Sequence, residues 1–198
     1  MIQVTNRYWI WAGPIALFSL ILDQFTKALV LGNDVFNARG CLFSPTPNCG
    51  KIEISQSFDL SMVWNYGMSF GMMQSDGIGR WILFAVTFVI VIAFTAWLLK
   101  AERKMTALAL AFVIGGAIGN MIDRARFGAV VDFMDFSGPW FGIKFNATSG
   151  PFAWIDKAIY NGDGILGLGF PYVFNVADMA ISVGAIILIA DQLLAKEG

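Results

Sequence analysis

"MTALALAFVIGGAIGNMIDRARFGAVVDF", residues 105–133, is the stretch that decides the fold of this 198-residue chain. Its first part, Met105–Ile122, contains no charged side chain, and a helix needs about 20 apolar residues to cross a bilayer. The run then ends abruptly in Asp123, Arg124 and Arg126. We therefore predict a membrane-spanning helix with a polar cluster at one end, facing partly into a helix bundle.

Three further stretches have the same character. The chain is 57% hydrophobic and only 14% charged, whereas soluble domains carry about a quarter charged residues. We predict one integral membrane domain over residues 1–198, an all-α bundle of four transmembrane helices. The net charge of -1 offers no basic face, which argues against nucleic-acid binding. The predicted spans are Tyr8–Leu31, Gly79–Leu99, Met105–Ile122 and Val176–Ala195.

The short basic loop between the second and third spans sets the orientation. It contains Lys100, Arg103 and Lys104, and lysine and arginine in short loops favour the cytoplasmic side. Both termini are then predicted to be cytoplasmic, and the long connections 32–78 and 123–175 face outward. In the first connection, "KIEIS" and "FDLSM" alternate apolar and polar residues, which predicts a small extracytoplasmic antiparallel sheet with one apolar face. In the second, "FAWIDKAIY" (152–160) predicts a short interfacial amphipathic helix.

Histidine is absent from the chain, which restricts the possible chemistry. Ser-His and Cys-His catalysis and histidine-ligated metals are excluded, so acid–base catalysis would fall to carboxylates, lysine, tyrosine or water. Cys41 and Cys49 lack a metal-binding spacing, and we expect no metal and no cofactor. Both cysteines lie in the first outward connection, where an oxidising compartment would allow a disulfide between them.

Several polar residues interrupt the apolar spans, where a charge is costly. Asp23 and Lys27 are four residues apart on one helix face, which favours an ion pair that locks the first helix to its neighbours. Gly115 and Gly119 have the spacing of close helix packing. Asn175 can cap the fourth helix with Asp178 in its first turn, so capping and catalysis both remain open for Asp178.

The predicted topology brings these residues to one depth. Asp23, Asp123, Asp132 and Asp178 all fall near the outward ends of their helices or just beyond them. Two carboxylates that are close in a low-dielectric site share a proton, so that one accepts a proton from water while the other donates to a carbonyl. This is aspartic peptidase chemistry, and it requires neither histidine nor a metal.

Five segments, in order along the chain, resemble the lipoprotein signal peptidases (signal peptidase II) of bacteria. They are "DQFTK" (23–27), "NYGMSFG" (65–71), "GGAIGNMIDR" (115–124), "VVDF" (130–133) and "FNVADMAI" (174–181). The resemblance implies an inner-membrane aspartic endopeptidase, active near the outer face, that removes signal peptides from prolipoproteins before a diacylglyceryl-modified cysteine. Its implied partners are lipidated prolipoprotein signal peptides and membrane lipid.

The resemblance also implies roles for individual residues. Asp132 and Asp178 match the catalytic pair, while Asp23, Lys27 and Asp123 match structural positions. Residues 32–50 and 136–174 are longer than the family pattern. Asp135 has no family role, so we expect it to be a solvated loop acid. The positions that match substrate-binding or site-shaping residues are Asn65, Gly116, Asn120, Arg124 and Asn175.

Two other classes of function compete with the peptidase. Buried acids relay protons in transporters and channels, which makes a small proton-coupled transporter the main alternative. Against it, the inner halves of the second and third spans contain no acid, Asp191 lies at the inner end of the fourth span, and the chain has no internal repeat. A non-catalytic membrane scaffold is the third possibility, which measured peptidase activity would dismiss.

Overall fold

The computed structural model describes residues 8–41, 48–55, 57–67, 78–137, 144–146, 165–167 and 172–195. By its internal contacts the chain divides into two compact units. We call the first the helical unit and the second the sheet unit. The helical unit contains Met1–Leu29, Asn65–Val131 and Asn175–Gly198, and the sheet unit contains Val30–Trp64 and Asp132–Phe174.

The helical unit confirms the four predicted transmembrane helices. Each of its long helices is apolar and long enough to cross a bilayer. They are α1 (Trp9–Leu31), α3 (Ile78–Leu98), α4 (Lys104–Phe127) and α6 (Val176–Ala195).

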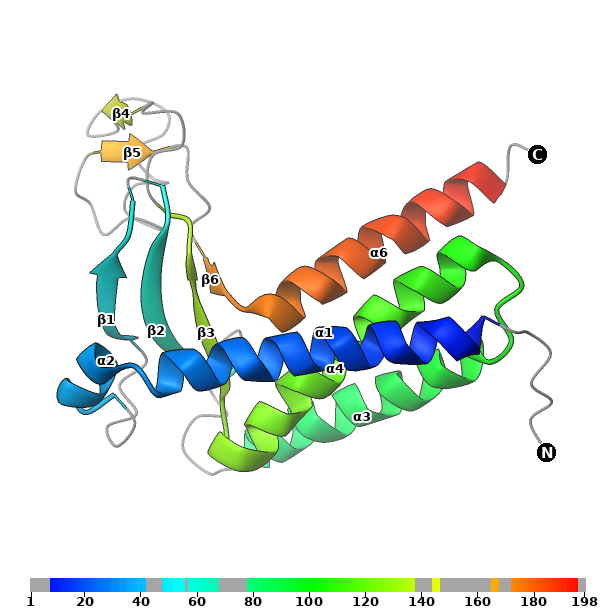
Figure 1. The fold of residues 1–198 in the computed structure, drawn as a ribbon, viewed down its shortest axis with the longest axis horizontal. Coiled ribbons are helices and arrows are strands. Elements are labelled where there is room, and N and C mark those ends of the chain that lie inside the picture. The colour runs from blue at the N-terminus through cyan, green and yellow to red at the C-terminus, as the bar shows by residue number, and fades with distance from the viewer. Residues whose placement is uncertain are drawn as a thin grey trace. The chain divides into compact units, whose positions relative to one another are not determined.

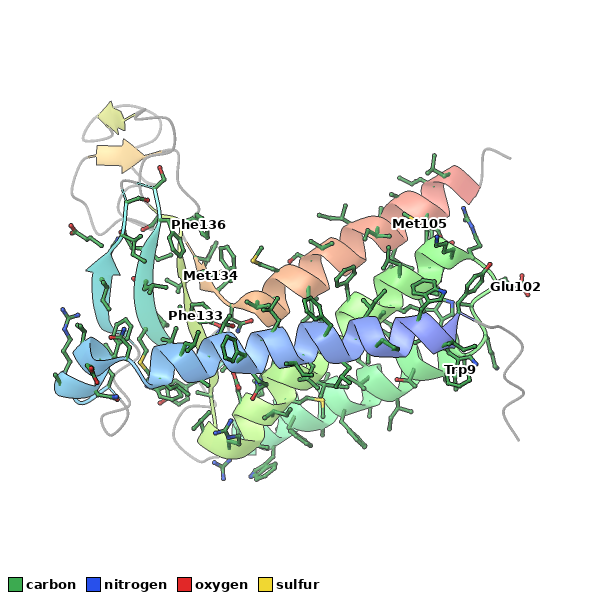
Figure 2. The ribbon with its side chains drawn as sticks, viewed as in Figure 1. Trp9, Glu102, Met105, Phe133, Met134 and Phe136 are labelled. Carbon is green, nitrogen blue, oxygen red and sulfur yellow. A yellow bond between two sulfur atoms is a disulfide. The ribbon has the colours of Figure 1, made fainter. Side chains whose placement is uncertain are left out.

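Helix α4 is the buried centre of the helical unit, and it packs against α3 and α6 (Figure 1). Its glycines allow close approach: a Cβ added at Gly115 would meet Ser19 and the carbonyl of Ala16 on α1, as the packing prediction requires. The surrounding helices instead expose large apolar side chains, as expected for surfaces that contact lipid. Trp9 on α1 and Met105 at the start of α4, each 48% exposed, are labelled in Figure 2.

Helix α4 continues five residues beyond the predicted end at Ile122 (123–127). The prediction stopped there because Asp123 begins a charged segment. In the structure Asp123 is 1% exposed and is neutralised by Lys27 of α1, so its charge does not end the helix. The helix ends instead at Gly128, whose φ of 79° suits the left-handed C-terminal position that glycine adopts without strain.

The other end of α4 is tied to the last turns of α6. The Asp191 carboxylate is buried and accepts a hydrogen bond from Thr106, and it forms an ion pair with Arg103 at 2.9 Å. This contact and the glycine contacts of α4 fix the two helices against each other at both ends.

The sheet unit is built around a small antiparallel sheet, as predicted. Its strand order is β1-β2-β3-β6, and β1 pairs antiparallel with β2, as β3 does with β6. A separate pair, β4 (Lys144–Asn146) and β5 (Ile165–Gly167), is also antiparallel. The four strands are β1 (Asn48–Glu53), β2 (Asp59–Asn65), β3 (Val130–Asp135) and β6 (Val173–Phe174).

The segment before β1 forms a short helix that the sequence did not predict, α2 (Asp34–Ala38), capped by the Asn33 side chain. Cys41 follows it, is buried, and forms a disulfide with Cys49 of β1. The indole of Trp64 donates to the Cys41 carbonyl at 3.1 Å. The disulfide therefore joins the α2 segment to the sheet. The predicted interfacial helix at 152–160 lies outside the described residues.

Candidate active site

The first turn of α6 holds Asp178 by reciprocal capping. The Asp178 backbone N–H donates to Asn175 Oδ1 at 2.9 Å, and the Asn175 N–H donates to Asp178 Oδ2 at 3.4 Å. Each side chain thus satisfies a backbone donor of the other, which fixes the start of the helix. The predicted N-cap is confirmed. Capping does not rule out chemistry, because the Asp178 carboxylate remains partly exposed.

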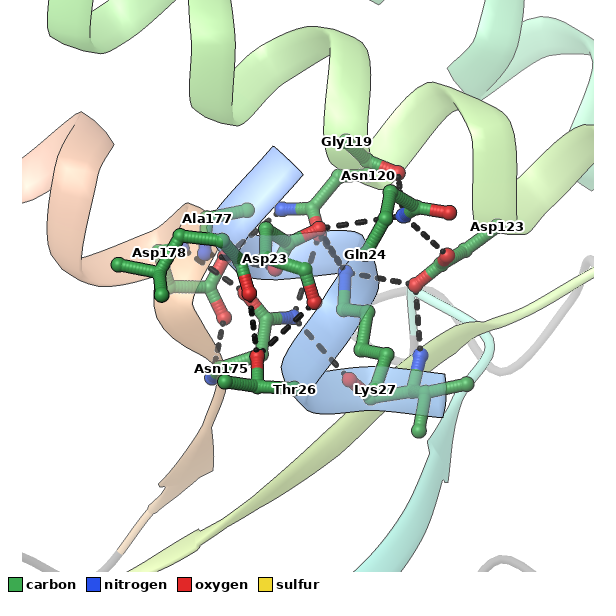
Figure 3. Close-up of polar contacts among 12 residues, drawn as sticks. Asp23, Gln24, Thr26, Lys27, Gly119, Asn120, Asp123, Asn175, Ala177 and Asp178 are labelled. Carbon is green, nitrogen blue, oxygen red and sulfur yellow. Dashed lines mark hydrogen bonds and ion pairs between the residues drawn. The ribbon is translucent and has the colours of Figure 1, made fainter. Parts of the chain in front are cut away.

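Asn120 of α4 connects Asp178 to the rest of the network (Figure 3). Its Nδ2 donates to Asp178 Oδ1 at 2.9 Å. Its Oδ1 accepts from Lys27 Nζ and from Asn175 Nδ2, each at 3.2 Å. Because two donors converge on the amide oxygen, the amide can turn only its N–H groups toward Asp178. The orientation of Asn120 is therefore set by the surrounding residues.

Lys27 is the positive centre of this network, and it is 2% exposed. Its Nζ lies 2.8 Å from Asp23 Oδ2 and 2.7 Å from Asp123 Oδ2. With the bond to Asn120, all three ammonium donors have acceptors. The i,i+4 ion pair predicted within the first span is present, and it is joined by Asp123 from α4.

The two acids beside Lys27 also hold backbone groups. Asp23 Oδ1 accepts from the N–H of Ala177 at 2.9 Å, so α1 contributes to capping α6. Asp123 Oδ2 accepts from the N–H of Val131 at 3.2 Å, and Gln24 Nε2 donates to Asp123 Oδ1 at 3.0 Å. Both carboxylates are saturated by a cation and by hydrogen bonds. They are suited to organising the site, because their oxygens are already occupied by these contacts.

Asp132 follows directly on a backbone segment that this network holds from both sides. The N–H of Val131 donates to Asp123, and its carbonyl accepts from Asn175 Nδ2 at 3.3 Å. Asp132 itself belongs to the sheet unit, lies on β3 and is 2% exposed. The sequence did not predict β3, because "VVDFMD" lacks the alternation typical of a half-buried strand.

The contacts of the other predicted substrate-binding residues are local. Arg124 Nη1 donates to the carbonyl of Asn120 at 3.3 Å. Asn65 Oδ1 accepts from the N–H of Gly67 at 2.8 Å, which stabilises the turn after β2. A Cβ added at Gly116 would meet the Ala177 carbonyl, so this glycine lets α4 approach the turn that carries Asp178.

Asp135 is not the solvated loop acid that we expected. It is the last residue of β3, is 6% exposed, and accepts from Ser61 Oγ at 2.7 Å. Lys51 Nζ lies 3.4 Å from Asp135 Oδ2 and 2.6 Å from Asp59 Oδ2. The sequence does not indicate this cluster, because its members become neighbours only through strand pairing. The alternation of "FDLSM" located the strand, but not the partners of its polar residues.

The described residues contain no group of three or more Cys, Asp or Glu side chains arranged to hold a metal ion. In the helical unit the polar side chains are instead arranged as a hydrogen-bonded system around Lys27. Such a system can orient a carboxylate and its amide neighbours toward a polar substrate.

Comparison with known proteins identifies the family of the chain. The model of the signal peptidase (SPase) II family matches residues 15–194. A lipoprotein signal peptidase from Caulobacter vibrioides is 34% identical over 197 residues, covering 99% of this chain and 94% of that protein. Another from Methylorubrum extorquens is 36% identical over 186 residues, covering 92% and 85%. A solved bacterial membrane enzyme, 23% identical, covers 92% of each chain with a TM-score of 0.62, which shows a shared fold.

Proposed function

Because the chain belongs to the signal peptidase II family, we propose that it removes signal peptides from prolipoproteins as an aspartic endopeptidase. Family membership makes it a multi-pass bacterial membrane peptidase, and this favours proteolysis over the transporter alternative. The substrate is a lipidated prolipoprotein, cleaved just before its diacylglyceryl-modified cysteine. The site faces the outer side of the inner membrane, and both termini are cytoplasmic.

The observation that carries the catalytic assignment is the contrast among the acids of the Lys27 network. Asp23 and Asp123 each contact the Lys27 ammonium and are essentially buried. Asp178 is partly exposed, and its contacts are hydrogen bonds from Asn120 and the Asn175 backbone. A carboxylate that is oriented by neutral donors and partly exposed is accessible to a water molecule, whereas the oxygens of one paired to a buried cation are already occupied.

Asp132 is the proposed partner of Asp178. It follows Val131, whose N–H and carbonyl are both held by side chains of the Lys27 network. In this proposal the two carboxylates share one proton. The ionised one removes a proton from a water molecule, and the resulting hydroxide attacks the scissile carbonyl. The protonated one donates to the carbonyl oxygen, and the new amine takes a proton as the C–N bond breaks.

Polar side chains around the dyad hold the peptide. Arg124 and Asn65 provide donors to substrate carbonyls, and Asn120 and Asn175 orient Asp178 and the start of β3. Gly116 contributes by allowing α4 and α6 to approach closely. Positioning of this kind provides a large share of the rate enhancement in an enzyme.

The test is to replace each dyad residue separately, as Asp132→Asn and Asp178→Asn. Each variant is purified in detergent and assayed for cleavage of a diacylglyceryl-modified precursor. We expect each to lose at least about 10³-fold in kcat, because a single member of a catalytic unit is not replaceable. The control is Asp34→Asn, an exposed acid on α2, which should retain full activity. Near-normal turnover by either folded dyad variant would refute the assignment.

A further inference from the structure

The sequence of β3 is Val-Val-Asp-Phe-Met-Asp. Its apolar residues do not determine which of its two alternating sets of side chains points to which side of the sheet. Apolar residues occupy both alternating sets, with Val130 and Met134 on one face and Val131 and Phe133 on the other. The only polar residues of the strand are its two acids. Asp132 and Asp135 are three residues apart, so they point to opposite faces of the sheet. Figure 2 shows Phe133, Met134 and Phe136 along this segment.

The face that carries Asp135 also carries the buried Val131 and Phe133, but it is polar around Asp135 at the end of the strand. Asp135 accepts from Ser61 of β2 and pairs with Lys51 of β1. Lys51 lies directly opposite Ser61 in the β1–β2 register, and it also pairs with Asp59 at 2.6 Å. One ammonium group therefore connects three adjacent strands. Asp135 Oδ1 also accepts from the Ser137 N–H at 2.9 Å, which closes the turn after β3.

The face that carries Asp132 is apolar and aromatic. Met134, on the same face as Asp132, lies opposite Phe174 of β6. Just beyond the strand, the ring of Phe136 stacks on Phe174 with centroids 5.6 Å apart and lies 4.8 Å from Phe58. The catalytic candidate Asp132 thus shares a surface with aromatic rings, while Asp135 points to the charged surface.

We propose that Asp135 is a positioning residue that sets the register of β3 and thereby the face on which Asp132 lies. The proposal rests on the catalytic role of Asp132 proposed above. A shift of one residue moves every side chain of a strand to the opposite face. Such a shift would place the Asp135 carboxylate among the aromatic rings, away from Lys51, and turn Asp132 away from the apolar face. Because valine, phenylalanine and methionine fit either face, the discrimination among side chains comes from Asp135, which adds to the backbone contacts that hold Val131 at the start of the strand.

The register can be measured directly, without reference to activity. In the full-length protein, the cysteine pair made by Met134→Cys and Phe174→Cys should form a disulfide, because opposed cross-strand side chains are close. The pair Phe133→Cys and Phe174→Cys should not, since these side chains lie on opposite faces. Adding Asp135→Ala should lower the ratio of the first cross-link to the second by about tenfold, the order expected for losing the Ser61 hydrogen bond together with the partly exposed Lys51 pair.

Kinetics supply the second readout. Asp135→Ala should lower kcat by about tenfold or more with KM nearly unchanged, since the proposal places Asp132 in the chemical step. Asp135→Asn keeps the shape and the acceptor for Ser61, so it should recover part of both the cross-link ratio and kcat. Lys51→Met should give an intermediate effect. The matched control is Glu53→Gln on β1, an exposed acid that should change neither measurement.

An unchanged cross-link ratio in Asp135→Asn and Lys51→Met would overturn the proposal, and these two variants decide it if Asp135→Ala does not insert. This outcome differs from failure of the dyad assignment. Full activity of Asp132→Asn would refute the dyad and leave the cross-link ratio as evidence on register alone. Lowered cross-link ratios in the Asp135 and Lys51 variants, together with loss of activity in Asp132→Asn, would support both proposals.

Discussion

The molecule contains two clusters of the same composition, one lysine between two aspartates, in very different surroundings. In the helical unit, Lys27 pairs with Asp23 and Asp123, and all three side chains are at most 2% exposed. In the sheet unit, Lys51 pairs with Asp59 and Asp135, and its side chain is 41% exposed. The first cluster is enclosed within a helix bundle. In the second, the two carboxylates are buried, but the lysine reaches solvent.

The difference shows how surroundings decide what an ion pair does. Removing one partner of a buried pair leaves an uncompensated charge, which is far more costly than losing a pair at the surface. The Lys27 cluster is therefore expected to be required for folding of the site. The Lys51 cluster should contribute little to stability but can still select one strand register.

Lys27→Met should have the largest effect. It leaves Asp23 and Asp123 buried without their cation, so the free energy of unfolding should fall by about 3–5 kcal/mol. Thermal or denaturant unfolding of the purified protein in detergent measures this. Combining Lys27→Met with Asp123→Asn should recover part of the loss, because one buried charge is removed. A Lys27→Met protein as stable as Lys51→Met would mean that the two clusters do not differ as described.

Loss of the disulfide should come next. The Cys41–Cys49 bond closes a short loop in the sheet unit, and its removal should cost about 2–3 kcal/mol by loop entropy. Unfolding of Cys41→Ser with Cys49→Ser, compared with the oxidised parent, measures the cost. This would show a covalent link stabilising the sheet unit where the helical unit uses a buried ion pair. Full thiol labelling of both cysteines in the unreduced protein would contradict the bond.

Lys51→Met should reduce stability by less than about 1 kcal/mol, because its ammonium is partly hydrated and screened. The loss should shrink as salt is added, whereas the loss in Lys27→Met should not. Unfolding of both variants at low and high ionic strength provides the measurement. Equal salt sensitivity of the two variants would argue against the difference in burial.

The pH dependence of the sheet cluster should be the smallest effect. Burial alone would raise the pKa of Asp135, but hydrogen bonds from Ser137 and Ser61 and the charge of Lys51 outweigh it and lower the pKa below 3.8. Burial would likewise lower the pKa of Lys51, but the Asp59 hydrogen bond and the charges of Asp135 and Asp59 raise it above 10.5.

The two pKa shifts affect the free energy of unfolding at opposite ends of the pH range. The Asp135 contribution is complete above pH 3.8 and is lost as pH falls through its lowered pKa. The Lys51 contribution is complete below pH 10.5 and is lost as pH rises through its raised pKa. The stability difference between the parent and Lys51→Met, measured by unfolding across this range, should therefore be largest below pH 10.5 and shrink as pH rises through the raised Lys51 pKa, because only the parent loses the lysine contribution there. Identical profiles would show that the cluster does not titrate with folding.

Sequence analysis predicted the features that depend on local patterns. The four spans follow from summed hydrophobicity and bilayer thickness, and the Asp23–Lys27 pair follows from helical spacing. The Asn175–Asp178 cap depends on residues three apart. Ordered motifs then indicated the family, although the pairing of Asp132 with Asp178 remains a proposal.

Only the tertiary structure could decide the contacts that join distant segments. Lys51 and Asp135 are 84 residues apart in the sequence (135 − 51), and only the order of the strands makes them neighbours. From the sequence alone, Asp135 was therefore predicted to be a solvated loop acid. The end of α4 was likewise misplaced, because the charge of Asp123 is compensated by Lys27 on another helix. Hydrophobicity and helical periodicity are sums over neighbouring residues and can be read along the chain. The cost of a charge depends on what the fold places beside it.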